Sequence, residues 1–103
     1  MDPQLKRGLL ELVVLAAIKT EDSYGYKIIQ DISALIEISE STLYPILRRL
    51  EQQNYVERYN VIHLSRVRKY YKITLKGRDE LQNAHADLDK LKKIYAFIIK
   101  EGV

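Results

Sequence analysis

Residues 39–74 read SESTLYPILRRLEQQNYVERYNVIHLSRVRKYYKIT, and a change of periodicity inside this stretch decides the fold. Its first part predicts a helix that Ser39 caps and that carries an inward apolar stripe at helical spacing. This stripe consists of Leu43, Ile46, Leu47 and Leu50. After Gln53 and Asn54 the residue types favour β-structure. One strand is expected around residues 55–59 and a second around residues 67–73, with residues 60–66 as the hairpin tip.

Two more helices are expected before this stretch. Asp2 followed by Pro3 is a typical helix start, and residues 5–19 form a helix that is apolar on nearly every side. Asp22 or Ser23 is expected to cap a second helix, in which Gly25 would let another backbone approach closely. The apolar stripe of this second helix consists of Tyr24, Ile28, Ile32 and Leu35. Residues 36–38 alternate in polarity, which is typical of a very short strand.

The order helix, helix, helix, strand, strand is that of a winged helix-turn-helix, a mainly α fold with a small β-hairpin. Thr74 is then expected to cap a last helix that runs to about residue 100. We therefore divide the chain into a winged-helix part, residues 1–74, and a C-terminal dimerisation helix, residues 75–103, within a single domain.

The last helix carries an unbroken heptad seam. Its members are Leu81, Ala84, Leu88, Leu91, Tyr95 and Ile98. A helix of this length projects past a three-helix core and cannot bury such a seam within one subunit, so we expect a homodimer. The apolar first helix would add Leu5 and Leu9 to the same interface. Packing of the seam within one chain remains the alternative.

The composition is that of an ordinary soluble domain. The chain has 103 residues, of which 47% are hydrophobic and 30% charged, and it has no cysteine. Its longest apolar run is too short to span a membrane, and no signal peptide is readable. We therefore expect a cytoplasmic protein without membrane association.

The net charge is only +3, but the charge is unevenly distributed. Residues 58–78 contain seven Lys and Arg residues and no acid, whereas residues 1–57 contain six bases and nine acids. A basic block in a nearly neutral protein is typical of a phosphate-binding surface, although a solvated basic hairpin would look the same.

Helix 39–52 and the hairpin supply the candidate DNA contacts. The outward helix residues are Ser41, Thr42, Tyr44, Arg48 and Arg49, and the wing residues are Arg66, Arg68 and Lys69. Hydroxyl, aromatic and cationic groups at the start of a recognition helix suit base edges and phosphates, and the wing cations suit the DNA backbone or a minor groove. Alternatively, Arg48 and Arg49 simply lie on a solvent-exposed helix face, as most arginines do.

Four segments in the right order resemble the PadR family of transcriptional regulators. They are LLELVVL (9–15), SYGYKII (23–29), STLYPILRRLE (41–51) and RKYYKITLKG (68–77). The resemblance covers roughly residues 5–80 and implies a dimeric winged-helix repressor whose C-terminal helix joins the subunits. A dimer would present two reading heads, which predicts a palindromic operator. The resemblance also places Tyr24, Tyr26 and Lys27 near the DNA.

The chain departs from the family pattern in two places, namely the connection between the second and third helices and the tip of the wing. The connection over residues 34–39 is shorter than usual. The wing reads VIHLS at residues 61–65 where a glycine-rich tip is common. These apolar residues would contact another protein, or the strands would simply extend further.

Other classes of function find less support in the sequence. His63 and His85 lack the spacing of metal ligands, and no nucleophile or phosphate-loop motif is present, so we predict no enzyme, metal or organic cofactor. A winged-helix module that binds protein and does not read DNA remains the alternative. Some members of the family bind aromatic molecules between the first and last helices. Binding of such an effector by this chain remains a further alternative.

Overall fold

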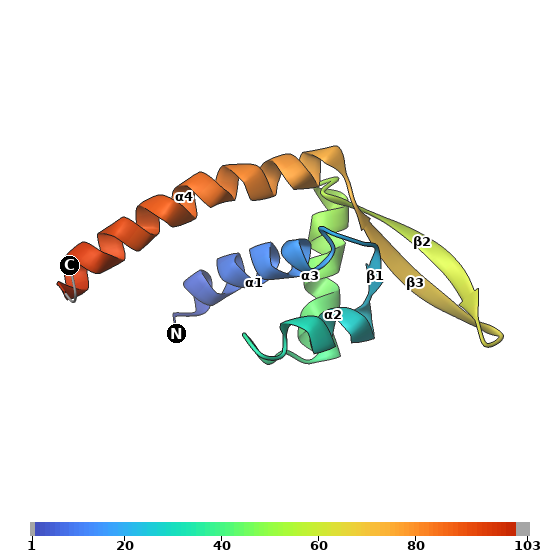
Figure 1. The fold of residues 1–103 in the computed structure, drawn as a ribbon. Helices are drawn as coiled ribbons and strands as arrows, with labels where there is room; N and C mark the ends of the chain where they lie inside the picture. Colours follow the sequence, from blue (N-terminus) through green and yellow to red (C-terminus); the bar gives the residue numbers. More distant parts are fainter. Residues whose placement is uncertain (1, 101–103) are drawn as a thin grey trace.

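The computed structural model describes residues 2–100 and confirms the expected order of elements, with one additional strand (Figure 1). The elements are α1 (Pro3–Ala17), β1 (Ser23–Tyr24), α2 (Gly25–Ile32), α3 (Glu40–Gln52), β2 (Val56–His63), β3 (Arg66–Ile73) and α4 (Leu75–Ile99). The three strands form one antiparallel sheet in the order β1-β3-β2. The chain is therefore a mainly α winged helix-turn-helix with a long C-terminal helix.

Side-chain caps fix the starts of three helices where the sequence predicts them. The carboxylate of Asp2 accepts hydrogen bonds from the backbone N–H groups of Gln4 and Leu5, at 3.1 and 3.0 Å. The hydroxyl of Ser39 accepts from the N–H of Thr42, and that of Thr74 accepts from the N–H of Gly77. Each cap satisfies a backbone donor that has no partner inside its helix.

The start and the end of α2 correct the predictions. Neither Asp22 nor Ser23 caps this helix, because Ser23 and Tyr24 form β1 and pair with Tyr71 and Tyr70 of β3. At the other end, α2 stops at Ile32, so Leu35 leaves the apolar stripe and is 81% exposed. Residues 36–38 form no strand.

The hairpin strands extend beyond residues 55–59 and 67–73, which confirms that the strands continue through most of the apolar segment 61–65. Residues 60–63 and Arg66 belong to paired strands, with Val61 opposite Arg68 and Ile62 opposite Val67. Only Leu64 and Ser65 remain as the tip, because the β-branched residues beside them continue the ladder. We call this hairpin, residues 56–73, the wing.

The hydrophobic core lies where α1, α2 and α3 meet the base of the wing. Its buried residues are Leu10, Val14, Leu15, Ile18, Ile28, Ile32, Leu43, Ile46, Leu47, Leu50, Val56, Tyr71 and Ile73. The predicted inward stripe of α3 is therefore confirmed. We call residues 3–73 the body, since they enclose this core.

Helix α4 contributes little to the core. Within residues 75–99 only Gly77 is fully buried, against the backbone of Tyr55, and Leu81 packs partly against the core. In Figure 1 α4 leaves the body at the base of the wing and runs back over α1. None of the helices in residues 2–100 is both long and apolar enough to cross a membrane.

Candidate nucleic-acid interface

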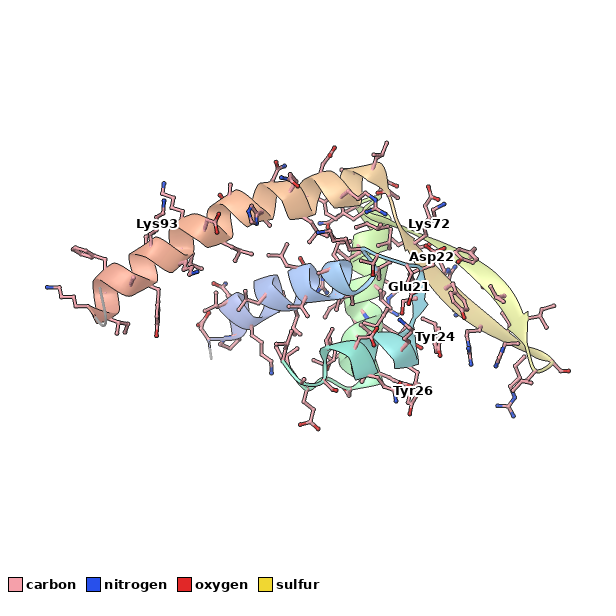
Figure 2. The ribbon with its side chains drawn as sticks, in the orientation of Figure 1. Glu21, Asp22, Tyr24, Tyr26, Lys72 and Lys93 are labelled. Carbon is pink, nitrogen blue, oxygen red and sulfur yellow. The ribbon has the colours of Figure 1, made fainter. Side chains whose placement is uncertain are left out.

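An open cavity of about 640 Å³ separates the starts of α2 and α3 from the wing. Its lining residues are Tyr24, Gly25, Tyr26, Glu40, Tyr44, His63, Leu64, Arg66, Val67, Arg68 and Lys69. Six of these are DNA contacts that the sequence predicts: Tyr24, Tyr26, Tyr44, Arg66, Arg68 and Lys69. Figure 2 shows Tyr24 and Tyr26 at the start of α2, on the side of that helix nearer the wing. The fold thus gathers aromatic groups of the helices and cations of the wing around one space.

An aromatic ladder supports the cationic edge of the wing. Tyr24, Tyr70 and Tyr59 are cross-strand neighbours, so their rings lie on one face of the sheet. The ring centroids of Tyr24 and Tyr70 are 5.2 Å apart, and those of Tyr70 and Tyr59 are 5.7 Å apart. The guanidinium carbon of Arg68 lies 4.1 Å from the centroid of the Tyr24 ring. This cation–π contact fixes the position of Arg68 on the ladder.

Asp22 ties the wing to the segment before β1. The Tyr59 hydroxyl donates a 2.5 Å hydrogen bond to the Asp22 carboxylate. This bond raises the pKa of Tyr59 to about 12, because the neutral phenol is the form that donates. Sequence reasoning missed Tyr59, Tyr70 and Asp22, since their association depends on the pairing of β1 with β3.

Within the described part of the chain, the wing cations at the cavity have no acidic partner. In residues 2–100, Arg66, Arg68 and Lys69 form no ion pair with a carboxylate, whereas Arg58 at the base of the wing lies 3.8 Å from Glu51. Glu40 is the acid that lines the cavity, opposite these three cations. The balance of charge around the cavity is therefore positive, which favours an anionic ligand.

Tyr44 differs from its predicted position. It does not point away from the core but packs partly against it, with its hydroxyl next to Gly25 at the start of α2. A Cβ at position 25 would lie 2.7 Å from that hydroxyl. The close neighbour of Gly25 is thus a side chain, not the backbone that we expected.

The structure places Ser41 and Thr42 near the cap of α3. Their hydroxyls lie 2.9 and 3.2 Å from the hydroxyl of Ser39, and both residues are exposed. Ser41 and Thr42 are absent from the lining of the wing cavity, as is the exposed Arg48 one or two turns along α3. Ser41 and Arg48 are seven residues apart and share one face of α3, which we call the polar strip, whereas Thr42 lies on the face towards α1.

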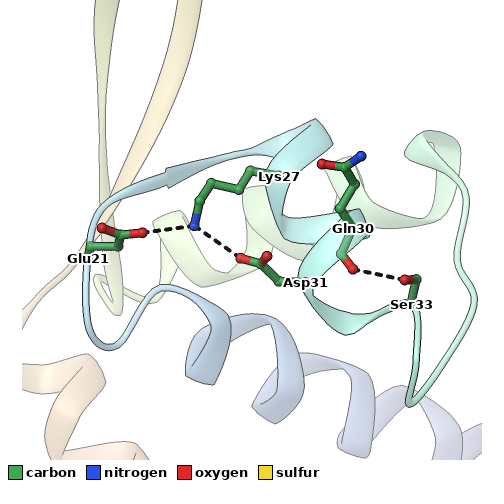
Figure 3. A network of polar contacts seen from close by, with 5 residues as sticks. All are labelled: Glu21, Lys27, Gln30, Asp31 and Ser33. Carbon is green, nitrogen blue, oxygen red and sulfur yellow. Dashed lines mark hydrogen bonds and ion pairs between the residues drawn. The ribbon is translucent and has the colours of Figure 1, made fainter.

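Arg49 and Lys27 are held by acids of the body. The Nε atom of Arg49 donates to Glu11 of α1 at 2.8 Å, because the face of α3 that carries Thr42 and Arg49 lies towards α1. The Nζ atom of Lys27 lies 2.9 Å from Glu21 and 3.1 Å from Asp31, as the dashed lines in Figure 3 show. These hydrogen bonds raise the pKa of Lys27. The structure does not bring either cation to the wing cavity.

A local turn also holds the C-terminal end of α2. The hydroxyl of Ser33 donates to the carbonyl oxygen of Gln30 at 2.8 Å (Figure 3). This contact and the Lys27–Asp31 bond are local to α2 and its C-terminal turn, whereas the Lys27–Glu21 bond joins α2 to the segment before β1.

The residues that the sequence predicts for dimerisation line the other side of the molecule. A second cavity of about 640 Å³ lies between α1 and α4, and Leu9, Leu81 and Leu88 line it. The remaining predicted positions have large exposed fractions: Leu5 50%, Leu91 49%, Tyr95 62% and Ile98 68%.

Within residues 2–100 no group of three or more acids and histidines is placed to hold a metal ion.

Comparison with known proteins gives the relationships of the chain. Residues 14–83 match the model of the transcriptional regulator PadR-like family. The structure of smu.1704 from Streptococcus mutans is 38% identical and has a TM-score of 0.81, over 92% of this chain and 90% of that one. A PadR-like transcription factor from Bacteroides fragilis is 32% identical with a TM-score of 0.82, over 92% and 94%. PadR of Bacillus subtilis, solved in complex with operator DNA, shares the fold at 21% identity and a TM-score of 0.68, over 73% and 45%.

Proposed function

The chain belongs to the PadR-like family of transcriptional regulators, and from this premise we propose that it binds operator DNA as a homodimer and represses transcription. The family consists of regulators of transcription rather than enzymes. The binding of operator DNA by PadR of Bacillus subtilis supports DNA as the partner.

One observation carries the proposal, namely the cavity that joins the starts of α2 and α3 to the wing. Arg66, Arg68 and Lys69 are free of acidic partners within the described chain, and they line this space together with Tyr24 and Tyr26, with Arg68 over the Tyr24 ring. Free cations beside hydroxyl-bearing aromatic rings suit the sugar-phosphate backbone. We propose that one DNA strand passes between α2 and the wing.

The polar strip of α3 would then lie in the adjacent major groove. A recognition helix contacts base edges in the major groove, and Ser41 in the first turn of α3 and Arg48 about two turns further along are both exposed. Tyr44 connects the two contacts, because it lines the cavity and also packs against α2. We assign base contacts to Ser41 and Arg48, and backbone contacts to the cavity residues.

The homodimer is proposed from the apolar surface of α4. Leu88, Leu91, Tyr95 and Ile98 follow the heptad seam and are 43% to 68% exposed in the single chain. Burial of these side chains against a second copy would release roughly 25 cal/mol for each Å² of apolar surface removed from water. Two wings and two α3 helices in one particle would read a two-fold symmetric operator, and coverage of that site would block transcription.

Titration of a labelled duplex with the protein at several salt concentrations tests this function. The operator comes from selection of bound sequences out of a random duplex library, and we expect a two-fold symmetric consensus. The affinity should fall by about 10³-fold or more between 50 and 200 mM salt, because several phosphate contacts release counterions. A binding curve that does not change with salt would favour the protein-binding module instead.

A further inference from the structure

The tip of the wing exposes apolar side chains that the fold does not use. Ile62 is 79% exposed, Leu64 is 84% exposed and Val67 is 64% exposed. Ile62 and Val67 are cross-strand partners, so they share one face of the hairpin just behind Leu64. Figure 1 shows this end of the wing projecting well away from the helices. None of these three residues belongs to the core.

The backbone of the tip is poorly suited to its residues. Leu64 and Ser65 have φ angles of 50° and 65°, in the left-handed region. Two-residue hairpin turns of this kind favour Asn and Gly, because a bulky side chain is strained at positive φ. With Leu64 exposed, no packing offsets that strain in the free protein. A residue that breaks a local rule without a structural gain is a candidate for function.

The surroundings of the tip indicate what it contacts. Residues 58–78 contain no acid, and Arg66, Arg68 and Lys69 flank the apolar residues. Leu64 and Val67 line the same cavity as Tyr24 and Tyr44, which is the surface proposed above for DNA. An apolar side chain on a cationic hairpin is complementary to a nucleic acid, since phosphates meet the cations and stacked bases meet the apolar group.

We propose that Leu64, supported by Ile62 and Val67, is a wedge that enters the minor groove and partly unstacks one base step of the operator. This proposal rests on the proposed DNA binding and adds a mode of sequence selection to it. Unstacking is easiest at flexible pyrimidine–purine steps such as TA and CA/TG. The wing would therefore favour such a step in each half-site without hydrogen bonds to its bases, and it would bend the duplex.

The test compares the wild-type protein with Leu64→Asn on the selected operator. The adenine analogue 2-aminopurine at the proposed step reports unstacking by its fluorescence, and dyes at the two duplex ends report bending by energy transfer. With the wild type we expect a rise in fluorescence and a shorter distance between the ends. With Leu64→Asn both signals should disappear and the affinity should fall about tenfold. Asn tolerates positive φ, so the substitution should leave the fold intact.

Two further variants separate the wedge from a general loss of apolar surface. Leu75→Asn removes a leucine that is 80% exposed at the start of α4, outside the lining of the wing cavity, and should change neither signal. Leu64→Phe keeps a large apolar group at the tip and should retain both signals. Replacement of the flexible step by a stiff A-tract should weaken the wild type but leave Leu64→Asn nearly unaffected.

The outcomes distinguish this inference from the proposed function. If the wild type binds no duplex, the proposed function fails and the wedge fails with it. If the wild type binds with the expected salt dependence but Leu64→Asn bends and binds the operator equally well, only the wedge is overturned. The apolar tip would then be assigned to contact with a protein.

Discussion

The body and α4 differ in where their apolar side chains go. The body encloses its thirteen core residues with its own helices and strands, and several of them, such as Val14 and Leu47, have no exposed surface. Helix α4 carries a comparable series of apolar residues, yet Leu88 and Leu91 remain 43% and 49% exposed. The pattern of spacing is equally regular in both regions. Regular spacing therefore predicts an apolar face, but not which partner covers it.

The same contrast applies to charge. The body presents the unpaired cations of the wing and the cavity beside them, whereas Lys27 and Arg49 of the body are paired with acids. The DNA-binding function is thus proposed for one end of the molecule, and association with a second copy for the other. The first three of the following predictions test this division, and the last two refine the description of the body.

The largest effect is expected from a cavity in the core of the body. Leu47→Ala should lower the free energy of unfolding by about 3 kcal/mol, because Leu47 is completely buried. Urea unfolding followed by circular dichroism should show this loss at every protein concentration. Leu91→Ala should instead act through the dimer, so its effect should vary with protein concentration. Equal and concentration-independent losses would contradict the difference between body and α4.

Dimerisation should be lost when a charge is placed on the α4 seam. Leu88→Asp should raise the dissociation constant of the dimer about 100-fold or more, because a carboxylate would be buried without a partner. Sedimentation equilibrium measures this change, and circular dichroism checks that the body stays folded. Ala86→Asp introduces the same charge on the opposite side of α4 and should leave the dimer intact. A dimeric Leu88→Asp protein would refute the assigned interface.

DNA affinity should depend on the wing and not on the lysines of α4. Arg66→Ala combined with Arg68→Ala should weaken binding to all sequences by roughly tenfold or more, and should reduce the salt slope by about two. Lys90→Ala combined with Lys93→Ala removes the same number of charges from α4 and should change affinity by about twofold or less. Fluorescence anisotropy at three salt concentrations measures both pairs. An unchanged slope for the arginine pair would remove the wing from the phosphates.

Gly25 and Gly8 differ in the space available for an added Cβ. Gly25→Ala should displace Tyr44, whose hydroxyl would lie 2.7 Å from the new Cβ, and should reduce specific DNA affinity about tenfold. Addition of Tyr44→Phe removes the clashing atom and should restore part of this loss. At Gly8 on α1 a new Cβ would meet no atom within 4 Å, so Gly8→Ala should raise stability by about 0.5–1 kcal/mol. Full DNA affinity in Gly25→Ala would show that Tyr44 is not held in place by α2.

The smallest effect concerns the bond between Tyr59 and Asp22. The pKa of Tyr59 is raised to about 12 from a usual value of about 10, so the bond stabilises the fold fully below pH 10. This contribution should decline as the pH rises from about 10 through about 12. Absorbance of tyrosinate in the ultraviolet should show a component near pH 12 that returns towards pH 10 in Asp22→Asn. Burial also raises the pKa of Tyr55 and Tyr71, and those two late components should be the same in both proteins. An identical titration curve in the variant would contradict the hydrogen bond.

Much of the fold follows from local patterns. The caps at Asp2, Ser39 and Thr74 and the inward stripe of α3 are predictable because each depends on residues within one or two turns. Sequence patterns underestimate the length of the wing, since Val61 and Ile62 gain their strand conformation from partners across the hairpin. They misplace the start of α2 for the same reason, because β1 exists only beside β3.

The candidate site is less predictable than the fold. Residue types and positions indicate six of the residues around the wing cavity, including Tyr24 and Arg68. They do not indicate that Lys27 and Arg49 are bound to acids, or that Tyr59 and Tyr70 support the cationic edge. A side chain that faces outward from its own helix can still meet a neighbouring element, and periodicity contains no information about that neighbour.

The amino-acid sequence by itself determined the order of the helices and the hairpin, the caps of α1, α3 and α4, the uneven charge and the apolar seam of α4, because these properties depend on residues close together in the chain. The tertiary structure alone decided which cations stay free, where Tyr44 lies and how the wing meets α2. Those outcomes depend on contacts between segments that are far apart in the chain, such as Asp22 with Tyr59 and Glu11 with Arg49. Only the packed chain brings such groups within reach of one another.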